Sequence, residues 1–369
     1  MKSSNMKKYI LPSLVGRGWG LGLLLLAFPF CIACNDEWED EQYEQYISFK
    51  APLNDNGVTA IYVPYTRLKE DKTPELGMGI SYYDLPVIVA GSTHNSATRD
   101  VYFTHFDTLN VLNTARFGTP AYRSDIEDLY YKDMGLYDGM ASYPEVLTIP
   151  SGQDIALLRI QFDFNTIFKG SPKNMVEKWV LPIQIAPGHP GYTPHPRKNY
   201  SKAMLRVYPY NDYSGNYSAT TLKLSIASAP NGGTGLEEKR GYVKNDTTIF
   251  FYAGDIDETR VDRENYKVFF HFIPEAVGAT RGSVDIYSDN AVLNGFKNNG
   301  TASYDIIEEM DDIQPYLKHR YVVIRGINYL FTDYTSVEGF KQEYAVTGAI
   351  TLERQLNTQI PNEDQAIQW

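Results

Sequence analysis

The chain is poor in cysteine: its 369 residues contain only two, Cys31 and Cys34. This scarcity excludes a disulfide-stabilised scaffold and a cysteine-rich zinc site. The sequence also lacks the HxxxH spacing of zinc ligands, the GxSxG turn of serine hydrolases and the glycine-rich motifs that hold phosphates. Paired carboxylates of the glycoside hydrolase type leave no sequence pattern, so that class alone stays open. We predict that the protein is not an enzyme.

Long apolar runs are scarce as well. The longest runs from Gly18 to Phe30 and has 13 residues, whereas a membrane-spanning helix needs about 20. Basic residues precede it, namely Lys2, Lys7, Lys8 and Arg17. This order of a basic and then an apolar segment predicts a signal peptide over residues 1–33, with a transmembrane anchor as the alternative.

The end of this segment indicates a lipid anchor. The string Cys31-Ile32-Ala33-Cys34 resembles a bacterial lipobox, although Cys31 stands where leucine is usual. In such a motif the last cysteine becomes the lipid-modified first residue of the mature protein. Cleavage would remove Cys31 and leave Cys34 alone, so no intramolecular disulfide could form. Several acyl chains hold a domain durably on a bilayer, and we predict anchoring through Cys34 in the outer membrane.

Positive charge is the third shortage. The chain has 34 basic and 45 acidic residues, and residues 1–33 contain four basic and no acidic ones. A protein this acidic is a poor binder of nucleic acid, and we expect no such partner. Acidic residues begin at Asp36, two positions after Cys34, and predict a solvated tether over residues 34–45. The tether also resembles the acidic export signal of surface-exposed lipoproteins of Bacteroidetes, so we expect the protein to face the cell exterior.

Beyond the tether there is no long helical period, and apolar residues tend to alternate instead. About seven short strands over residues 46–209 predict an immunoglobulin-like β-sandwich. Within it, Val146–Pro150, the turn Ser151-Gly152 and Ile155–Phe162 predict a β-hairpin. Pro64, Pro86 and Pro182 predict edge or bulged strands, because proline cannot donate to a ladder.

The second half alternates more cleanly. Roughly eight strands with short connections follow one another over residues 210–356 and predict an antiparallel up-and-down β-barrel. Residues 357–369 are polar and predict a loose C-terminal tail. The fold class is therefore all-β, with a sandwich followed by a barrel.

The two halves together resemble a known group of proteins. Tyr46-Ile47-Ser48-Phe49 opens the first domain, Tyr213-Ser214-Gly215-Asn216-Tyr217 opens the second, and Gly348–Arg354 fits a last strand. With the lipid cysteine and acidic tether, the chain resembles Bacteroidetes surface lipoproteins with a DUF1735-type N-terminal domain and a calycin-like C-terminal domain of the DUF4361 type. The resemblance implies a cell-surface lipoprotein near glycan-uptake machinery, with a polysaccharide ligand and an outer-membrane transporter complex as expected partners.

One loop is a candidate metal site. Asp255, Asp257 and Glu258 follow a predicted strand closely, and calcium prefers such oxygen ligands. The 12-residue EF-hand pattern is missing, however, and a solvated acidic turn is the alternative. We expect no cofactor other than this candidate calcium ion.

Tyrosine is abundant, with 29 residues, and tyrosine rings can stack on the apolar faces of sugars. Trp179 lies in a predicted strand and is interpreted as a core residue. The candidate glycan-binding residues lie in loops and at the domain junction: Tyr122, Tyr130, Tyr131, Tyr137, Tyr143, Tyr192, Tyr208, Tyr210 and Tyr213.

The leading hypothesis is a non-enzymatic, glycan-binding accessory of a polysaccharide uptake system. One alternative is an adhesin or scaffold that binds protein partners. Another is a calycin-type carrier of a small apolar ligand inside the barrel, since a barrel of about eight strands holds one small ligand or fills with side chains. Phe250, Phe270, Phe272 and Tyr329 would fill it if they pointed inward.

Overall fold

A computed structural model of the chain describes residues 44–50, 58–106, 132–170, 179–258, 260 and 262–360. Strands make up 54% of it and helices 8%, so the all-β prediction is confirmed. Within these residues no helix is both long and apolar enough to cross a bilayer. The predicted signal peptide, Cys34, nearly all of the tether, Tyr122, Tyr130, Tyr131 and residues 361–369 lie outside the described residues.

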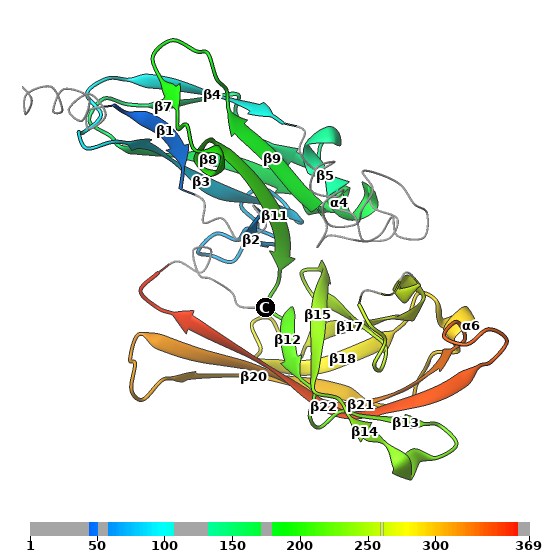
Figure 1. Cartoon of the computed structure of the whole chain (residues 1–369). Helices are drawn as coiled ribbons and strands as arrows, with labels where there is room; N and C mark the ends of the chain where they lie inside the picture. The colour runs from blue at the N-terminus through cyan, green and yellow to red at the C-terminus, as the bar shows by residue number, and fades with distance from the viewer. Residues whose placement is uncertain are drawn as a thin grey trace, which may run out of the picture.

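The first domain is a sandwich of two β-sheets (Figure 1). One sheet has the strand order β10-β1-β3-β8-β6, and the other has the order β2-β11-β9-β4-β7, with β5 paired to β9. The elements are β1 (Tyr46–Phe49), β2 (Thr59–Pro64), β3 (Ile80–Ala90), β4 (Arg99–His105), β5 (Lys132–Asp133), the 3₁₀ turn η2 (Met134–Leu136), β6 (Ala141–Ser142), β7 (Val146–Ile149), β8 (Ile155–Asp163), α4 (Phe164–Gly170), β9 (Trp179–Ile185), β10 (Thr193–Pro194), α5 (Lys198–Ser201) and β11 (Lys202–Tyr210).

The core of this domain lies between the two sheets. In β8, Leu158, Ile160 and Phe162 are buried, while the side chains between them face solvent. This alternation places every second side chain against the opposite sheet. Trp179 at the start of β9 is fully buried in the same core, which confirms its interpretation as a core residue.

Two sequence predictions about strand pairing are wrong. β7 pairs with β4, whereas β8 pairs with β3, so the turn at Ser151-Gly152 carries the chain from one sheet to the other. The predicted hairpin is therefore a connection between sheets. Pro64 ends β2, which is an edge strand as predicted. Pro86, however, lies in β3 and Pro182 in β9, and both of these strands are central in their sheets. A proline removes only one ladder bond, and strands of 11 and 7 residues retain enough others.

The second domain is a closed eight-stranded β-barrel (Figure 1). Its strands follow in the order β12-β15-β16-β17-β18-β20-β21-β22, and pairing of β22 with both β21 and β12 closes it. Its elements are β12 (Gly215–Ser218), β13 (Lys223–Ile226), the 3₁₀ turn η4 (Pro230–Gly232), β14 (Thr234–Gly235), β15 (Glu238–Asn245), β16 (Thr248–Tyr252), the 3₁₀ turn η5 (Arg263–Tyr266), β17 (Lys267–Pro274), β18 (Arg281–Tyr287), α6 (Ala291–Asn294), β19 (Lys297–Asn298), β20 (Ala302–Met310), β21 (Leu317–Asp333) and β22 (Gln342–Asn357).

Aromatic side chains fill the interior of the barrel. Tyr217 of β12 contacts Phe251 of β16 edge to face, with ring centroids 5.4 Å apart. The intervening strand β15 carries Gly241 at this level, where a Cβ atom would approach Phe251 to 3.2 Å. Glycine therefore gives the two rings room to meet across β15. Phe270 packs on Phe251 from the same face, at 4.9 Å.

The other three residues predicted to fill the barrel do not all point inward. Phe272 stacks on Tyr213 at 3.8 Å and packs on Tyr304, so it also fills the interior. Tyr329 is buried in the same core. Phe250 neighbours Phe251 in β16 and therefore points to the outer face, so it does not fill the barrel.

The two domains meet through side-chain contacts. β11 leads from the sandwich towards the barrel and into β12 (Figure 1). The Thr66 hydroxyl of the sandwich donates to Asp246 in the β15–β16 turn at 2.9 Å. Val243 of β15 belongs to the buried core of the sandwich. The β15–β16 turn of the barrel thus lies against the sandwich, and Arg240 further along β15 lies 5.6 Å from the Tyr208 ring of the sandwich.

Candidate functional site

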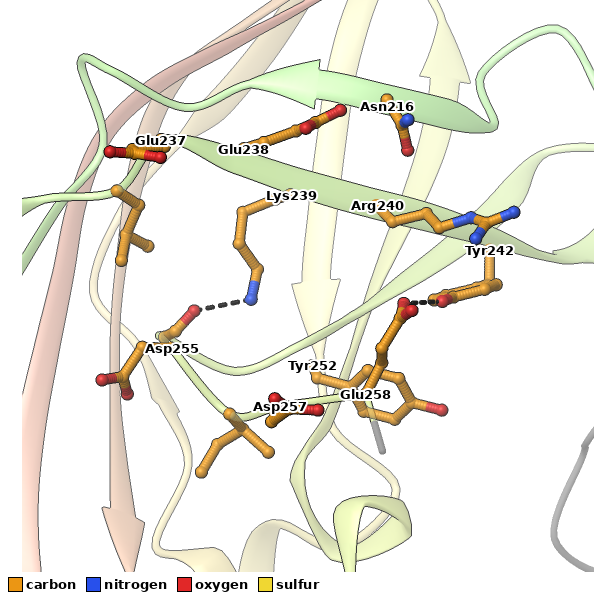
Figure 2. A pocket seen from close by; sticks show the side chains of 13 residues that line it. Asn216, Glu237, Glu238, Lys239, Arg240, Tyr242, Tyr252, Asp255, Asp257 and Glu258 are labelled. Atoms are coloured by element: carbon orange, nitrogen blue, oxygen red, sulfur yellow. Dashed lines mark hydrogen bonds between the residues drawn. The ribbon is translucent and has the colours of Figure 1, made fainter. Parts of the chain in front are cut away.

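A pocket of about 520 Å³ lies where β15 starts and β16 ends, at the end of this strand pair opposite the β15–β16 turn (Figure 2). We call it the distal pocket. Its walls are β12, the start of β15, the end of β16 and the loop Gly254–Glu258 that follows β16. The pairing of β15 with β16 brings this loop opposite Lys239. Its polar lining side chains are Asn216, Glu237, Glu238, Lys239, Arg240, Tyr242, Tyr252, Asp255, Asp257 and Glu258.

Lys239 lies at the centre of the distal pocket (Figure 2). Its Nζ donates a hydrogen bond to the Gly254 carbonyl at 2.6 Å. Burial lowers the pKa of Lys239 to about 8, and the nearby carboxylates of Asp255, Glu258 and Asp257 partly oppose that shift. No ion pair joins Lys239 to these carboxylates within the described chain. The ammonium group therefore remains a hydrogen-bond donor that faces the pocket.

The predicted metal-binding residues form the acidic side of the distal pocket. Asp255, Asp257 and Glu258 are all exposed, and Glu258 accepts a hydrogen bond from the Tyr242 hydroxyl. Across the ranges that the structure describes, no group of three or more His, Cys, Asp or Glu side chains is arranged to hold a metal ion. The geometry thus lends no support to a calcium site at this loop.

Two tyrosines of the strands line the distal pocket beside these polar groups. The Tyr242 and Tyr252 rings lie 5.9 Å apart at an angle of 59°. Tyr242 also stacks on Phe250 at 5.3 Å, and the Arg240 guanidinium lies 5.2 Å from the Tyr242 ring. Sequence reasoning missed both tyrosines, because it took its candidates from loops and from the domain junction.

The described candidate tyrosines of the sandwich do not form one cluster. Tyr137 is 44% exposed and touches buried Trp179 edge to face. Tyr143 packs against the domain core. Tyr192 is buried, and its hydroxyl donates to the Ala186 carbonyl at 2.8 Å, so it acts as a structural residue.

The three junction tyrosines also lie outside the distal pocket. Tyr208 stacks on Tyr62 at 5.4 Å on the sandwich. Tyr210 lines a smaller pocket of about 400 Å³ between the domains. Tyr213 packs into the barrel interior, where burial raises the pKa of its hydroxyl.

Comparisons with known proteins agree with this two-domain architecture. A family model described as a domain of unknown function, DUF4973, matches residues 38–188. A second model, described only as a "-like, C-terminal" domain, matches residues 201–351. A search of curated proteins finds no match.

Several solved structures are similar over nearly the whole chain. An auxiliary nutrient binding protein from Bacteroides thetaiotaomicron is 44% identical, with a TM-score of 0.73 over 89% of this chain and 100% of its own. A multidomain protein including DUF1735 from Bacteroides ovatus is 36% identical, with a TM-score of 0.70 over 88% of this chain and 100% of its own. The chain belongs to the same two-domain family as these Bacteroides proteins.

The two family models together cover both domains, including the barrel that carries the distal pocket. The DUF4973 match covers most of the sandwich, and the second match covers most of the barrel, which carries the pocket. The DUF1735 part of the expected resemblance is present in the description of one relative. The DUF4361 assignment stays a prediction.

Proposed function

We propose that the protein is a non-enzymatic accessory that captures a glycan nutrient at the cell surface. The observation that carries this proposal is the distal pocket, in which tyrosine rings, carboxylates and an amine line one cavity. A relative that shares 44% of its residues over its full length is described as an auxiliary nutrient binding protein, which supports the same role.

The chemistry of the distal pocket suits a sugar. Sugar rings have apolar C–H faces that pack on aromatic rings such as Tyr242, which is half-buried. Their hydroxyl groups donate to carboxylates such as Asp255 and accept from amines such as Lys239. A pocket of about 520 Å³ has the size of a typical small-ligand site.

The position of the distal pocket also suits capture. In the proposed arrangement, Cys34 carries the lipid anchor and the sandwich stands nearer the membrane than the barrel. The distal pocket lies at the end of the β15–β16 pair opposite the turn that contacts the sandwich, and its Arg240 lies 5.6 Å from the Tyr208 ring of the sandwich. Its Gly254–Glu258 side is exposed at Asp255, Asp257 and Glu258, and a polysaccharide or a partner transporter of the outer membrane could reach it there.

Calorimetry and affinity electrophoresis of the purified full chain against a panel of polysaccharides would test this function. We expect at least one glycan to bind, and Glu258→Gln to weaken that binding. Glu309→Gln is the matched control, because Glu309 is an equally exposed carboxylate in β20 outside the distal pocket. Failure of every glycan to bind would refute the proposal and would favour the adhesin or scaffold alternative.

The barrel interior argues against the third alternative, a carrier of an apolar ligand. Phe251, Phe270 and Phe272 are each less than 5% exposed and pack against one another or against Tyr217 and Tyr304. An apolar ligand would have to displace these packed rings, which costs more than filling a preformed cavity.

A further inference from the structure

The distal pocket has a donor on one wall and acceptors on the other, and this arrangement implies a ligand class. We propose that the distal pocket selects uncharged sugars that present two adjacent hydroxyl groups and rejects acidic sugars. This inference rests on the proposed function, because it names the class of glycan that the same pocket would take.

Lys239 supplies the donor. An ammonium group has three N–H bonds, and the Gly254 carbonyl accepts one of them at 2.6 Å. The side chain runs from β15 across the pocket to the facing loop (Figure 2). A sugar hydroxyl oxygen in the pocket can accept a further N–H, and a hydrogen bond from a charged donor is stronger than one from a neutral donor.

The loop after β16 supplies the acceptors. Asp255 and Asp257 are exposed and line the same cavity as Lys239. A sugar hydroxyl that accepts from an amine still has its own O–H to donate, and its neighbour on the ring can do the same. An amine opposite carboxylates therefore matches a pair of adjacent hydroxyls, each of which can both accept and donate.

The charge of the lining excludes acidic sugars. Five carboxylates line the distal pocket against two cations, Lys239 and Arg240, and the five are Glu237, Glu238, Asp255, Asp257 and Glu258. A uronate or sulfate group would enter a cavity of net negative charge, and like charges at short range repel. A neutral sugar meets no such repulsion.

Matched polysaccharides test this selectivity. Calorimetry of the full chain would compare polygalacturonate with its carboxyl-reduced product, a neutral galactan that has a primary alcohol in place of each carboxylate. We expect the neutral polymer of such a pair to bind at least about tenfold more tightly.

Two sets of variants test whether the preference for the neutral polymer arises in the distal pocket. Lys239→Gln should weaken neutral binding about tenfold, whereas Lys223→Gln should not, because Lys223 is an exposed lysine on β13 away from the pocket. The double variant Asp255→Asn and Asp257→Asn should bind the acidic polymer more tightly than the wild type does, so that the ratio of neutral to acidic affinity falls. Both positions are exposed, so we expect this variant to fold. It therefore tests the selectivity even if Lys239→Gln fails to fold.

The outcomes separate the two proposals. Tight binding of the acidic polymer, or neutral binding that no pocket variant changes, would overturn the ligand class while the glycan-binding function stands. Absence of binding to any polymer would overturn the function and the ligand class together.

Discussion

Arg354 near the end of β22 holds the junction of the two domains, and its replacement by methionine gives the sharpest test of the fold. The side chain is buried, and its Nη2 donates to the Asn211 carbonyl at 2.7 Å and to the Ser214 carbonyl. These two carbonyls belong to the segment that connects β11 to β12. One guanidinium therefore ties the last barrel strand to the entry of the barrel.

The magnitude follows from what Arg354→Met leaves behind. The Ser214 carbonyl loses the donor that Arg354 supplies, and the Asn211 carbonyl retains only a 3.4 Å contact from the Ser214 hydroxyl. Each unsatisfied buried group costs about 1–3 kcal/mol. Removing a buried charge offsets part of this cost, and burial does lower the pKa of Arg354. We expect a net loss of about 3 kcal/mol in the free energy of unfolding.

Thermal unfolding followed by circular dichroism would measure the effect. A loss of this size lowers the melting temperature by about 6–12 °C in a domain of this length. Arg325→Met is the control, because Arg325 is exposed and its ion pair with Asp305 lies on the barrel surface. We expect the control to change stability by less than about 0.5 kcal/mol. Equal effects of the two substitutions would refute the role assigned to Arg354.

Three further changes test other parts of the structure. Gly241→Val should cost about 1–3 kcal/mol in urea unfolding, because its Cβ would lie 3.2 Å from the Phe251 ring; unchanged stability would contradict the packed interior. Hydrogen bonding to Glu353 raises the pKa of His319 in the folded protein. The stability that protonated His319 adds is therefore fully present below its unfolded pKa of about 6.5, and it is lost as the pH rises through the folded pKa. The melting temperatures of the wild type and His319→Gln should therefore differ most at acidic pH and converge at alkaline pH. Burial raises the pKa of Asp246, so the charged form is disfavoured in the folded state. Asp246→Asn should raise the melting temperature at about pH 7 and not at about pH 3, where the carboxyl group is protonated; a gain at both pH values would point to another cause.

Much of the fold follows from local sequence. Side chains that alternate in polarity predict strands, since successive residues of a strand point to opposite faces. The barrel was predictable because its eight strands pair almost entirely with their neighbours in the chain. The sandwich was harder, because β7 and β8 are adjacent in sequence yet pair in different sheets. Alternation identifies a strand but does not say which strand it pairs with.

The candidate site was likewise predictable from the sequence only in part. The acidic loop Gly254–Glu258 stands out in the sequence, and it does line the distal pocket. Lys239 does not stand out, because it is one lysine among many until β15 pairs with β16 and brings it opposite that loop. Tyr242 and Tyr252 are equally inconspicuous as strand residues. The candidate tyrosines that are described lie in other parts of the molecule, since loop position alone does not say where loops meet.

The sequence by itself therefore determined the all-β class and the two-domain order, because both depend on the period of polarity and on short connections. The predicted signal peptide and the lipid anchor at Cys34 also depend on local order alone. Only the tertiary structure decided which side chains share a cavity. Lys239 and Asp255 are separated by a whole hairpin of the chain, and barrel pairing makes them neighbours at one barrel end.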